Sequence, residues 1–198
     1  PVAGPRKPGT VGRPLPGQTV AIMDPDGALV QPGEAGEVVV RGPNVMRGYL
    51  GKPGETAKTV VAGWLHTGDV GYFDADGYLV LVDRIKDMII RGGENIYPKE
   101  IEEFLYTHPA VKDVQVVGVP DKTYGEAVLA AVILKEGTTA TEEELKTFVR
   151  EHMAKHKTPK YVVFVEEFPM TASGKIQKFK IREWAIEHLH LEEAASIE

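Results

Sequence analysis

The stretch LVDRIKDMIIRGGENIYPKE, residues 81–100, decides how the rest of the chain is organised. A strand-like run ends in a charged cluster, residues 83–87, and an apolar trio, residues 88–90, follows it. The Gly92-Gly93 pair then indicates a turn, because glycine is used where the backbone takes a positive φ or passes close to a ligand. Pro98 begins a predicted helix with acidic residues in its first turns, where the helix dipole favours negative charge.

Two further motifs flank this stretch. Thr67-Gly68-Asp69 precedes it, and Ser173-Gly174-Lys175 follows it. An ionised aspartate offers two acceptor oxygens, which suits the vicinal hydroxyls of a ribose. A lysine ammonium can stabilise negative charge that gathers between two anions. Each tripeptide alone is also typical of a plain surface turn, but the three motifs together favour a nucleotide-dependent site.

In this order the three motifs resemble the adenylate-forming superfamily, which includes acyl-CoA synthetases, luciferases and the adenylation domains of peptide synthetases. The resemblance extends from about Gly9 to His190, and the segments RGGENIYPKEIE and PMTASGKIQKFKIRE are most similar to medium-chain fatty acyl-CoA synthetases. The chain contains neither the Ser/Thr/Gly-rich phosphate loop nor the aromatic-Gly-x-Thr-Glu segment of such enzymes. The resemblance therefore implies the C-terminal portion of a longer enzyme, and a fragment that is inactive alone.

The predicted fold class is α+β, in two parts. Residues 1–83 contain short strands and aspartate-rich turns, with a connector over residues 47–58, and the resemblance implies a short β-barrel segment from the end of a large N-terminal AMP-binding domain. Residues 84–198 are expected to form a small, mobile C-terminal domain with a hinge near residue 86. Its pattern predicts a three-stranded sheet, at residues 111–119, 127–134 and 161–165, and flanking helices, at residues 98–108, after a capping box at 141–144, and at 179–190.

The resemblance also implies roles for individual residues. Asp69 and Arg84 would bind the ribose and phosphate region of ATP or AMP. Lys175 would be the catalytic residue and would also contact this nucleotide. Lys86 would be the hinge, and Asn95 would lie near the acyl phosphate. The expected contacts with CoA are made by Gly92, Gly93, Glu94, Tyr124 and Lys160.

The activity that the resemblance implies has two half-reactions. A fatty acid, expected to be of medium chain length, attacks the α-phosphorus of MgATP to give acyl-AMP and pyrophosphate, and the CoA thiol then displaces AMP. Mg²⁺ would be bound mainly by the missing N-terminal part, and no metal site is expected in this chain. Lys175 and the Gly92-Gly93 turn would lie on opposite sides of the smaller domain, and rotation at Lys86 would exchange them.

Composition narrows the possible partners and the location of the protein. The chain has 23 Lys and Arg against 29 Asp and Glu, for a net charge of −6, so no nucleic-acid partner is expected. A basic region between Lys155 and Arg182 suits a small phosphate-bearing ligand. No apolar run approaches the roughly 18 residues of a membrane span. The absence of cysteine is compatible with a cytoplasmic location. The sequence carries no signal for an oligomeric state, and it gives His66 no role.

Two alternative functions remain. An adenylation domain that loads a carrier-protein phosphopantetheine would share these motifs, and a carrier domain after the last helix would support it. A non-catalytic binding module could keep the same fold. Such a module would have no reason to retain Asp69, Arg84, Lys86, Gly93 and Lys175 together.

Overall fold

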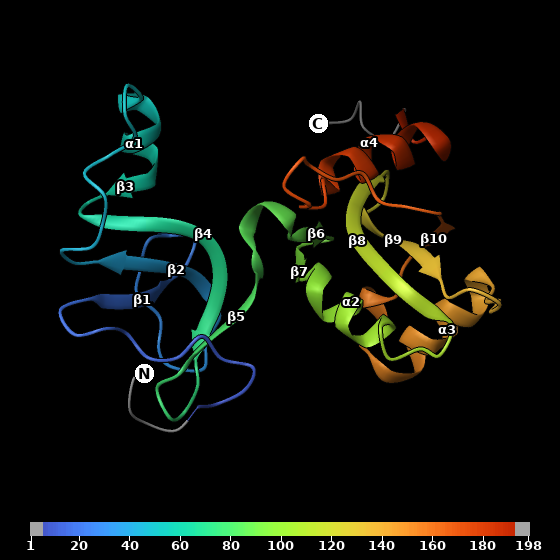
Figure 1. The fold of residues 1–198 in the computed structure, drawn as a ribbon, viewed down its shortest axis with the longest axis horizontal. Coiled ribbons are helices and arrows are strands. Elements are labelled where there is room, and N and C mark those ends of the chain that lie inside the picture. Colours follow the sequence, from blue (N-terminus) through green and yellow to red (C-terminus); the bar gives the residue numbers. More distant parts are fainter. Residues whose placement is uncertain (1–5, 193–198) are drawn as a thin grey trace. The chain divides into compact units, whose positions relative to one another are not determined.

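The computed structural model describes residues 6–192 and contains two compact units, which divide between Lys86 and Asp87 (Figure 1). Each unit has its own sheet and its own hydrophobic core. The ends of the two predicted domains, residues 1–5 and 193–198, lie outside the described residues. The mixture of strands and helices confirms the α+β fold class.

The first unit is a curved, five-stranded antiparallel sheet. Its strand order is β1-β2-β4-β3, and β5 also pairs with β4. Within residues 6–86 the sheet stays open, so the expected barrel segment is a half-barrel and not a closed barrel. The strands are β1 (Thr19–Met23), β2 (Gly36–Arg41), β3 (Val60–Val61), β4 (Trp64–Phe73) and β5 (Leu79–Arg84).

Two aspartates form the turns that the sequence predicts in this unit. The Asp24 carboxylate accepts hydrogen bonds from the amides of Asp26 and Ala28. The Asp74 carboxylate accepts in the same way from the amides of Asp76 and Tyr78, between β4 and β5. Aspartate favours such turns because its short side chain can bond to amides a few residues ahead.

The expected connector over residues 47–58 is partly helical, which corrects the sequence prediction. Helix α1 (Pro53–Thr59) begins at a proline, which is tolerated there because the first helical residue needs no amide donor. Every side chain of α1 is at least partly exposed. The sequence therefore lacks the apolar periodicity that would have indicated a helix.

The second unit is built around the long antiparallel pair β8 and β9. Strand β10 adds to β9 in parallel, and the short hairpin of β6 and β7 extends the sheet in the order β10-β9-β6-β7. The strands are β6 (Ile89–Arg91), β7 (Glu94–Ile96), β8 (Val111–Asp121), β9 (Gly125–Leu134) and β10 (Tyr161–Phe164). The helices are α2 (Pro98–Leu105), α3 (Glu142–His152) and α4 (Lys178–His188), with the 3-10 turn η2 (Lys155–Lys157). The 3-10 turn η1 (Ile85–Asp87) spans the boundary between the two units.

This sheet has five strands where the sequence predicts three. The two additional strands, β6 and β7, have three residues each, and Gly92 and Gly93 form the turn between them. Strands this short cannot show a periodic pattern, so the sequence indicates only a turn. The three longer predicted strands and the capping box at Thr141 and Glu144 are present.

Helices cover both faces of the second sheet (Figure 1). On one face, Val128 and Val132 of β9 pack in a cluster with residues of α2 and α3. On the other face, Leu129 and Ala131 pack in a cluster with residues of α4. Burial on both faces explains the continuous apolar run of β9. The second unit thus has two substantial buried clusters.

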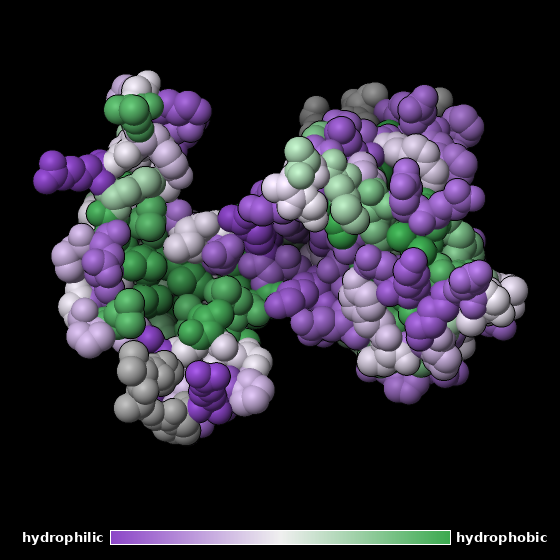
Figure 2. Space-filling model, viewed as in Figure 1, coloured by the Kyte–Doolittle hydropathy of each residue, from purple (hydrophilic) through white to green (hydrophobic). Residues whose placement is uncertain are grey.

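The first unit has a much smaller buried cluster, formed by Ile22, Val38 and Leu79. Several apolar side chains of this unit are exposed instead, among them Val11, Leu50 and Val61. Figure 2 shows apolar side chains gathered on the visible face of this unit. A half-barrel has one sheet face without a layer against it, which leaves apolar side chains in contact with water.

Candidate functional site

The structure pairs the two predicted nucleotide-binding residues, Asp69 and Arg84. They are register partners on the neighbouring strands β4 and β5. Asp69 Oδ1 lies 3.1 Å from Arg84 Nε. The Thr67-Gly68-Asp69 motif lies inside strand β4, next to irregularities in its pairing with both neighbouring strands. These irregularities interrupt the regular ladder next to Asp69, whose side chain is 36% exposed.

Glu37 and His66 hold the Thr67-Gly68-Asp69 segment of β4 in place. The sequence does not indicate a role for either residue. Glu37 Oε2 lies 2.7 Å from His66 Nδ1, and Glu37 Oε1 accepts a hydrogen bond from the Gly68 amide at 3.0 Å. The Thr67 hydroxyl donates to the Val38 carbonyl at 2.7 Å and accepts from the Asp69 amide at 3.1 Å. His66 therefore has a structural partner on β2, and no role in binding or chemistry is assigned to it. The Gly-Glu start of β2 is the signal that could have pointed to Glu37.

Lys86 lies in the 3-10 turn η1, and its side chain is exposed. The turn follows β5 directly, and the Asp83 carboxylate accepts from the Arg84 amide just before it. The position of Lys86 at the end of a strand is compatible with a hinge. Its role as the hinge stays a prediction.

Gly92 and Gly93 form a two-residue hairpin turn in which both glycines have positive φ, 60° and 86°. Such turns strongly favour glycine. The Gly92 amide donates to the Tyr124 carbonyl at 2.8 Å, and a Cβ on Gly92 would lie 3.2 Å from the Tyr124 ring. Arg91 lies over the same ring at 4.6 Å and donates to the His156 carbonyl at 3.2 Å. The turn and Tyr124, both expected to contact CoA, are therefore adjacent.

Asp121 connects Lys160 to this cluster. Its carboxylate accepts from Lys160 Nζ at 2.7 Å and from the amides of Thr123 and Tyr124. Burial acts to raise the pKa of Asp121, but the hydrogen bonds from Lys160 and from the two amides lower it overall. The hydrogen bond to Asp121 raises the pKa of Lys160, although burial opposes this. Lys160 is therefore a fixed cation beside Tyr124, and its charge is partly balanced by Asp121.

Glu94 and Asn95 follow the glycine turn on β7, and both side chains are exposed. They are paired through the backbone with Arg91 and Ile90 of β6. This places both residues on the same hairpin as Gly92 and Gly93. Their contacts with CoA and with the acyl phosphate stay predictions.

Lys175 lies in a hydrogen-bonded hairpin and not in an open loop. Met170 and Ile176 form a bridge across it, the Thr171 amide donates to the Lys175 carbonyl at 2.8 Å, and the Lys175 amide donates to the Thr171 hydroxyl at 3.1 Å. The Lys175 side chain is exposed and has no ion-pair partner among residues 6–192. The hairpin thus presents an ammonium whose charge is available to a ligand.

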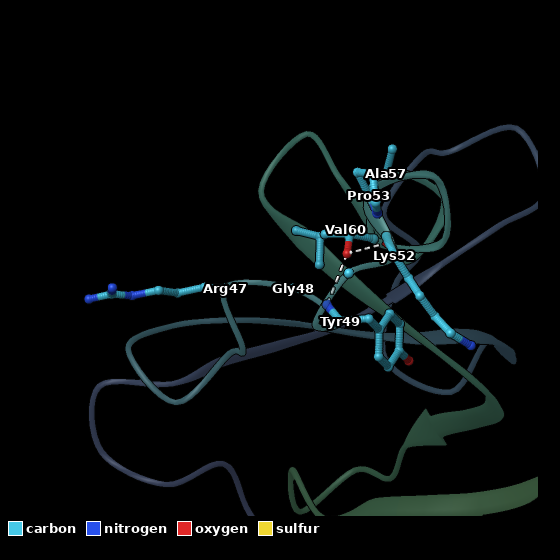
Figure 3. A pocket seen from close by; sticks show the side chains of 9 residues that line it. Arg47, Gly48, Tyr49, Lys52, Pro53, Ala57 and Val60 are labelled. Atoms are coloured by element: carbon cyan, nitrogen blue, oxygen red, sulfur yellow. Dashed lines mark hydrogen bonds between the residues drawn. The ribbon is translucent and has the colours of Figure 1, made fainter.

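Three further observations on the described residues add no residue to the candidate site. A shallow hollow of about 490 Å³ beside α1 is lined by residues such as Tyr49, Lys52 and Val60, and by none of the predicted site residues; the Arg47 side chain extends away from it (Figure 3). Residues 6–192 contain no group of three or more His, Asp or Glu side chains that could hold a metal ion. No helix in the same range is long and apolar enough to cross a membrane.

Sequence comparison identifies two parts of one enzyme family. Residues 1–50 match the family model for the AMP-binding enzyme, and residues 100–175 match that for the AMP-binding enzyme C-terminal domain. The putative acyl-CoA synthetase YngI of Bacillus subtilis is 52% identical over 184 residues, which are 92% of this chain and 34% of the relative. The mitochondrial medium-chain acyl-CoA ligase ACSF2 of Rattus norvegicus is 48% identical over 188 residues, or 94% and 31% of the two proteins. The chain thus spans about a third of the length of these relatives.

Solved structures have the same fold. ATP-bound MatB from Rhodopseudomonas palustris matches with a TM-score of 0.88 and 39% identity, over 93% of this chain and 37% of MatB. The amide bond synthetase McbA from Marinactinospora thermotolerans matches with a TM-score of 0.82 and 45% identity, over 89% of this chain and 36% of McbA. The chain therefore belongs to the adenylate-forming family of AMP-binding enzymes.

Proposed function

We propose that this chain is the C-terminal portion of an AMP-forming acid–thiol ligase, which activates a carboxylic acid as acyl-AMP and transfers the acyl group to CoA. The observation that carries the proposal is the exposed Lys175 ammonium on a hydrogen-bonded hairpin, which has no ion-pair partner in the described part of the chain, in a family member that also contains the Asp69–Arg84 pair. The small core and exposed apolar side chains of the first unit support its packing against further protein. The mobile C-terminal domain would then begin near Lys86.

The described residues suit the chemistry of the first half-reaction. The Asp69 carboxylate can accept hydrogen bonds from both ribose hydroxyls, and the Arg84 guanidinium can bind a neighbouring phosphate oxygen. Lys175 would bring a positive charge between the attacking carboxylate and the α-phosphate, where two anions must approach each other. The Mg²⁺ that accompanies ATP would be held mainly by other parts of the enzyme, because Mg²⁺ is usually bound by one or two carboxylates together with substrate phosphates and waters.

The second half-reaction would use the glycine hairpin. Gly92 and Gly93 leave its tip without side chains, so an extended pantetheine could pass close to the backbone. Tyr124 contacts Gly92, and Lys160 binds the Asp121 carboxylate that also accepts from the Tyr124 amide, so Lys160 could reach a CoA phosphate. Glu94 and Asn95 extend this surface along β7.

We propose a medium-chain fatty acid as the substrate, on the resemblance of the C-terminal motifs and the 48% identity to the rat ligase. CoA is the favoured acyl acceptor, and the other two candidates are a carrier-protein phosphopantetheine and an amine. The amine is included because McbA, at 45% identity, is named as an amide bond synthetase. The cytoplasmic location expected from the sequence stays a prediction, and the rat ligase is named as mitochondrial.

The test uses the full-length enzyme that contains this chain and measures the half-reactions separately. Lys175→Ala should slow acyl-AMP formation from octanoate and ATP about 100- to 1,000-fold, because one charge-stabilising contact is lost. Thioester formation from supplied octanoyl-AMP and CoA should stay near the parent rate. Equal loss of both steps would remove Lys175 from its proposed role. Offering CoA, a carrier protein with a free phosphopantetheine thiol, and an amine to the parent enzyme identifies the acceptor. The 198-residue chain alone should release no pyrophosphate.

A further inference from the structure

A buried carboxylate on α2 binds the residue that begins α4. Glu102 is only 9% exposed, between Ile101 and Leu105 in sequence, on the helix face that packs against the core. Its Oε1 atom accepts from the Val116 amide of β8 at 2.8 Å and from Lys178 Nζ at 2.7 Å. Burying a carboxylate is costly unless it is paired and hydrogen-bonded. The position of Glu102 therefore depends on Lys178.

Lys178 is an unfavourable residue for the start of a helix. It is the first residue of α4, and no acidic residue occupies the first turn. The positive end of the helix dipole lies there and disfavours a cation. The Lys178 side chain is only 21% exposed, and its ion pair with Glu102 compensates for this placement. We interpret its position as serving a contact outside the helix.

That contact lies at the base of the Lys175 hairpin. The hairpin closes at the Met170–Ile176 bridge, and the Gln177 amide donates to the Pro169 carbonyl at 2.8 Å. Lys178 follows Gln177 directly. The Glu102–Lys178 pair therefore fixes the point where the hairpin joins α4, while the hairpin itself extends to the exposed Lys175.

A second ion pair fixes the next turn of α4. Arg182, four residues after Lys178, lies 3.3 Å from Glu126 Oε1 of β9. The other oxygen of Glu126 accepts from the Ile90 amide of β6 at 2.8 Å. Two carboxylates on different elements thus bind one basic face of α4. They hold the start of the helix, and with it the base of the hairpin, in one place on the sheet.

We infer that Glu102 and Lys178 are positioning residues for Lys175 in the adenylate-forming half-reaction. The inference rests on the proposed function of Lys175. Lys178 is bound to Glu102, so it supports the hairpin without contacting the substrate. Because Lys175 serves only the first half-reaction in this proposal, the pair should affect that half-reaction alone. Among residues 6–192, the Lys178 side chain binds Glu102 of α2 and not a residue of the glycine hairpin, which serves the second half-reaction.

The experiment compares Lys178→Met, Lys178→Arg and Lys180→Met in the full-length enzyme. Lys178→Met should slow acyl-AMP formation about 10- to 100-fold, because displacing a catalytic group by about 1 Å costs up to that much. Thioester formation from supplied acyl-AMP should be unchanged. Lys178→Arg keeps the ion pair and should restore most of the lost rate. Lys180→Met removes a neighbouring exposed lysine of the same helix and should leave both steps at the parent rate.

The outcomes separate this inference from the proposed function. If Lys175→Ala slows acyl-AMP formation and Lys178→Met does not, the positioning role is wrong and the proposed function stands. If Lys175→Ala itself spares acyl-AMP formation, the proposed function of Lys175 is wrong. Equal loss of both half-reactions in Lys178→Met, without recovery in Lys178→Arg, would show a merely structural pair. If Lys178→Met does not fold, Glu102→Gln, which keeps an acceptor for the Val116 amide, decides by the same comparison.

Discussion

The Gly92 amide donates a hydrogen bond to the Tyr124 carbonyl oxygen at 2.8 Å. This bond joins the tip of the β6–β7 hairpin to the turn between β8 and β9. The hairpin otherwise pairs with β9 at one position, Arg91 with Gly125. The two segments that are expected to bind CoA are therefore fixed to each other close to the glycine turn.

We predict that Gly93→Ala slows the thiol step. Gly93 has φ of +86°, and a Cβ there would meet no described atom within 4 Å, so the substitution adds backbone strain and narrows the space above the turn. Gly137→Ala is a matched control, with φ of +74° and equally open surroundings in a distant turn of the same unit. Both variants should lose about 1 kcal/mol of stability. Only Gly93→Ala should slow thioester formation from supplied acyl-AMP, and an equal rate in the two variants would contradict the assignment.

We predict that Arg84→Met weakens ATP binding with little effect on stability. The Arg84 and Asp69 side chains are 52% and 36% exposed, so their ion pair should contribute no more than about 1 kcal/mol to folding. Loss of a charged hydrogen bond to the nucleotide should raise the KM for ATP about tenfold or more. Arg47→Met is the control, since that side chain is exposed and is none of the predicted site residues. A large fall in the unfolding midpoint with an unchanged KM would show that Arg84 has only a structural role.

We predict that Glu37→Ala also raises the KM for ATP, through Asp69. The substitution removes the acceptor for the Gly68 amide and the partner of His66, and so releases the segment that carries Asp69. Glu37→Gln keeps an acceptor oxygen and should recover most of the affinity. Glu34→Ala, at an exposed position just before β2, should behave as the parent. Steady-state kinetics with varied ATP measure the effect, and a parent-like KM in Glu37→Ala would contradict it.

We predict that Asp121 makes the stability of the second unit depend on acid pH. Its folded-state pKa is lowered, so the unfolded state binds protons more readily than the folded state. The contribution of Asp121 to stability is present above the ordinary aspartate pKa of about 4 and is lost as pH falls through the lower folded-state pKa. Asp121→Asn should therefore reduce the loss of stability as the pH falls below about 4. Urea unfolding at several pH values measures this, with the exposed Glu136→Gln as control. The same acid dependence in Asp121→Asn as in the parent would contradict the prediction.

The sequence predicted those parts of the fold that depend on local chemistry. The aspartate turns at Asp24 and Asp74, the capping box at Thr141 and the long apolar strands all appear, because each depends on neighbouring residues. Helix α1 was not predicted, because it buries no apolar face that would give a periodic signal. The short strands β6 and β7 were too short to be distinguished from a turn.

The supporting contacts of the site could not be predicted from the sequence. Asp69 and Arg84 were identified by motif, but their pairing depends on strand register. Glu37 and His66 come from two neighbouring strands, and Glu102 and Lys178 come from two helices, α2 and α4. Such contacts between residues far apart in the chain depend on the assembled fold. The sequence therefore indicated the motif residues as candidates, whose roles stay predictions, but it did not indicate the residues that hold them in place.

The strand pairing and the boundary between the two units together decide which residues of the candidate site can move together. Arg84 is paired with Asp69 inside the first sheet, whereas the chain divides into its second unit only after Lys86. If the second unit rotates at Lys86 between the half-reactions, Arg84 and Asp69 do not rotate with it. The ribose of the nucleotide would then keep its position relative to the first unit during both half-reactions. The acyl-AMP could stay bound at Asp69 and Arg84 while Lys175 moves away and the glycine hairpin takes its place. The acyl-AMP would then not need to dissociate and bind again between the half-reactions.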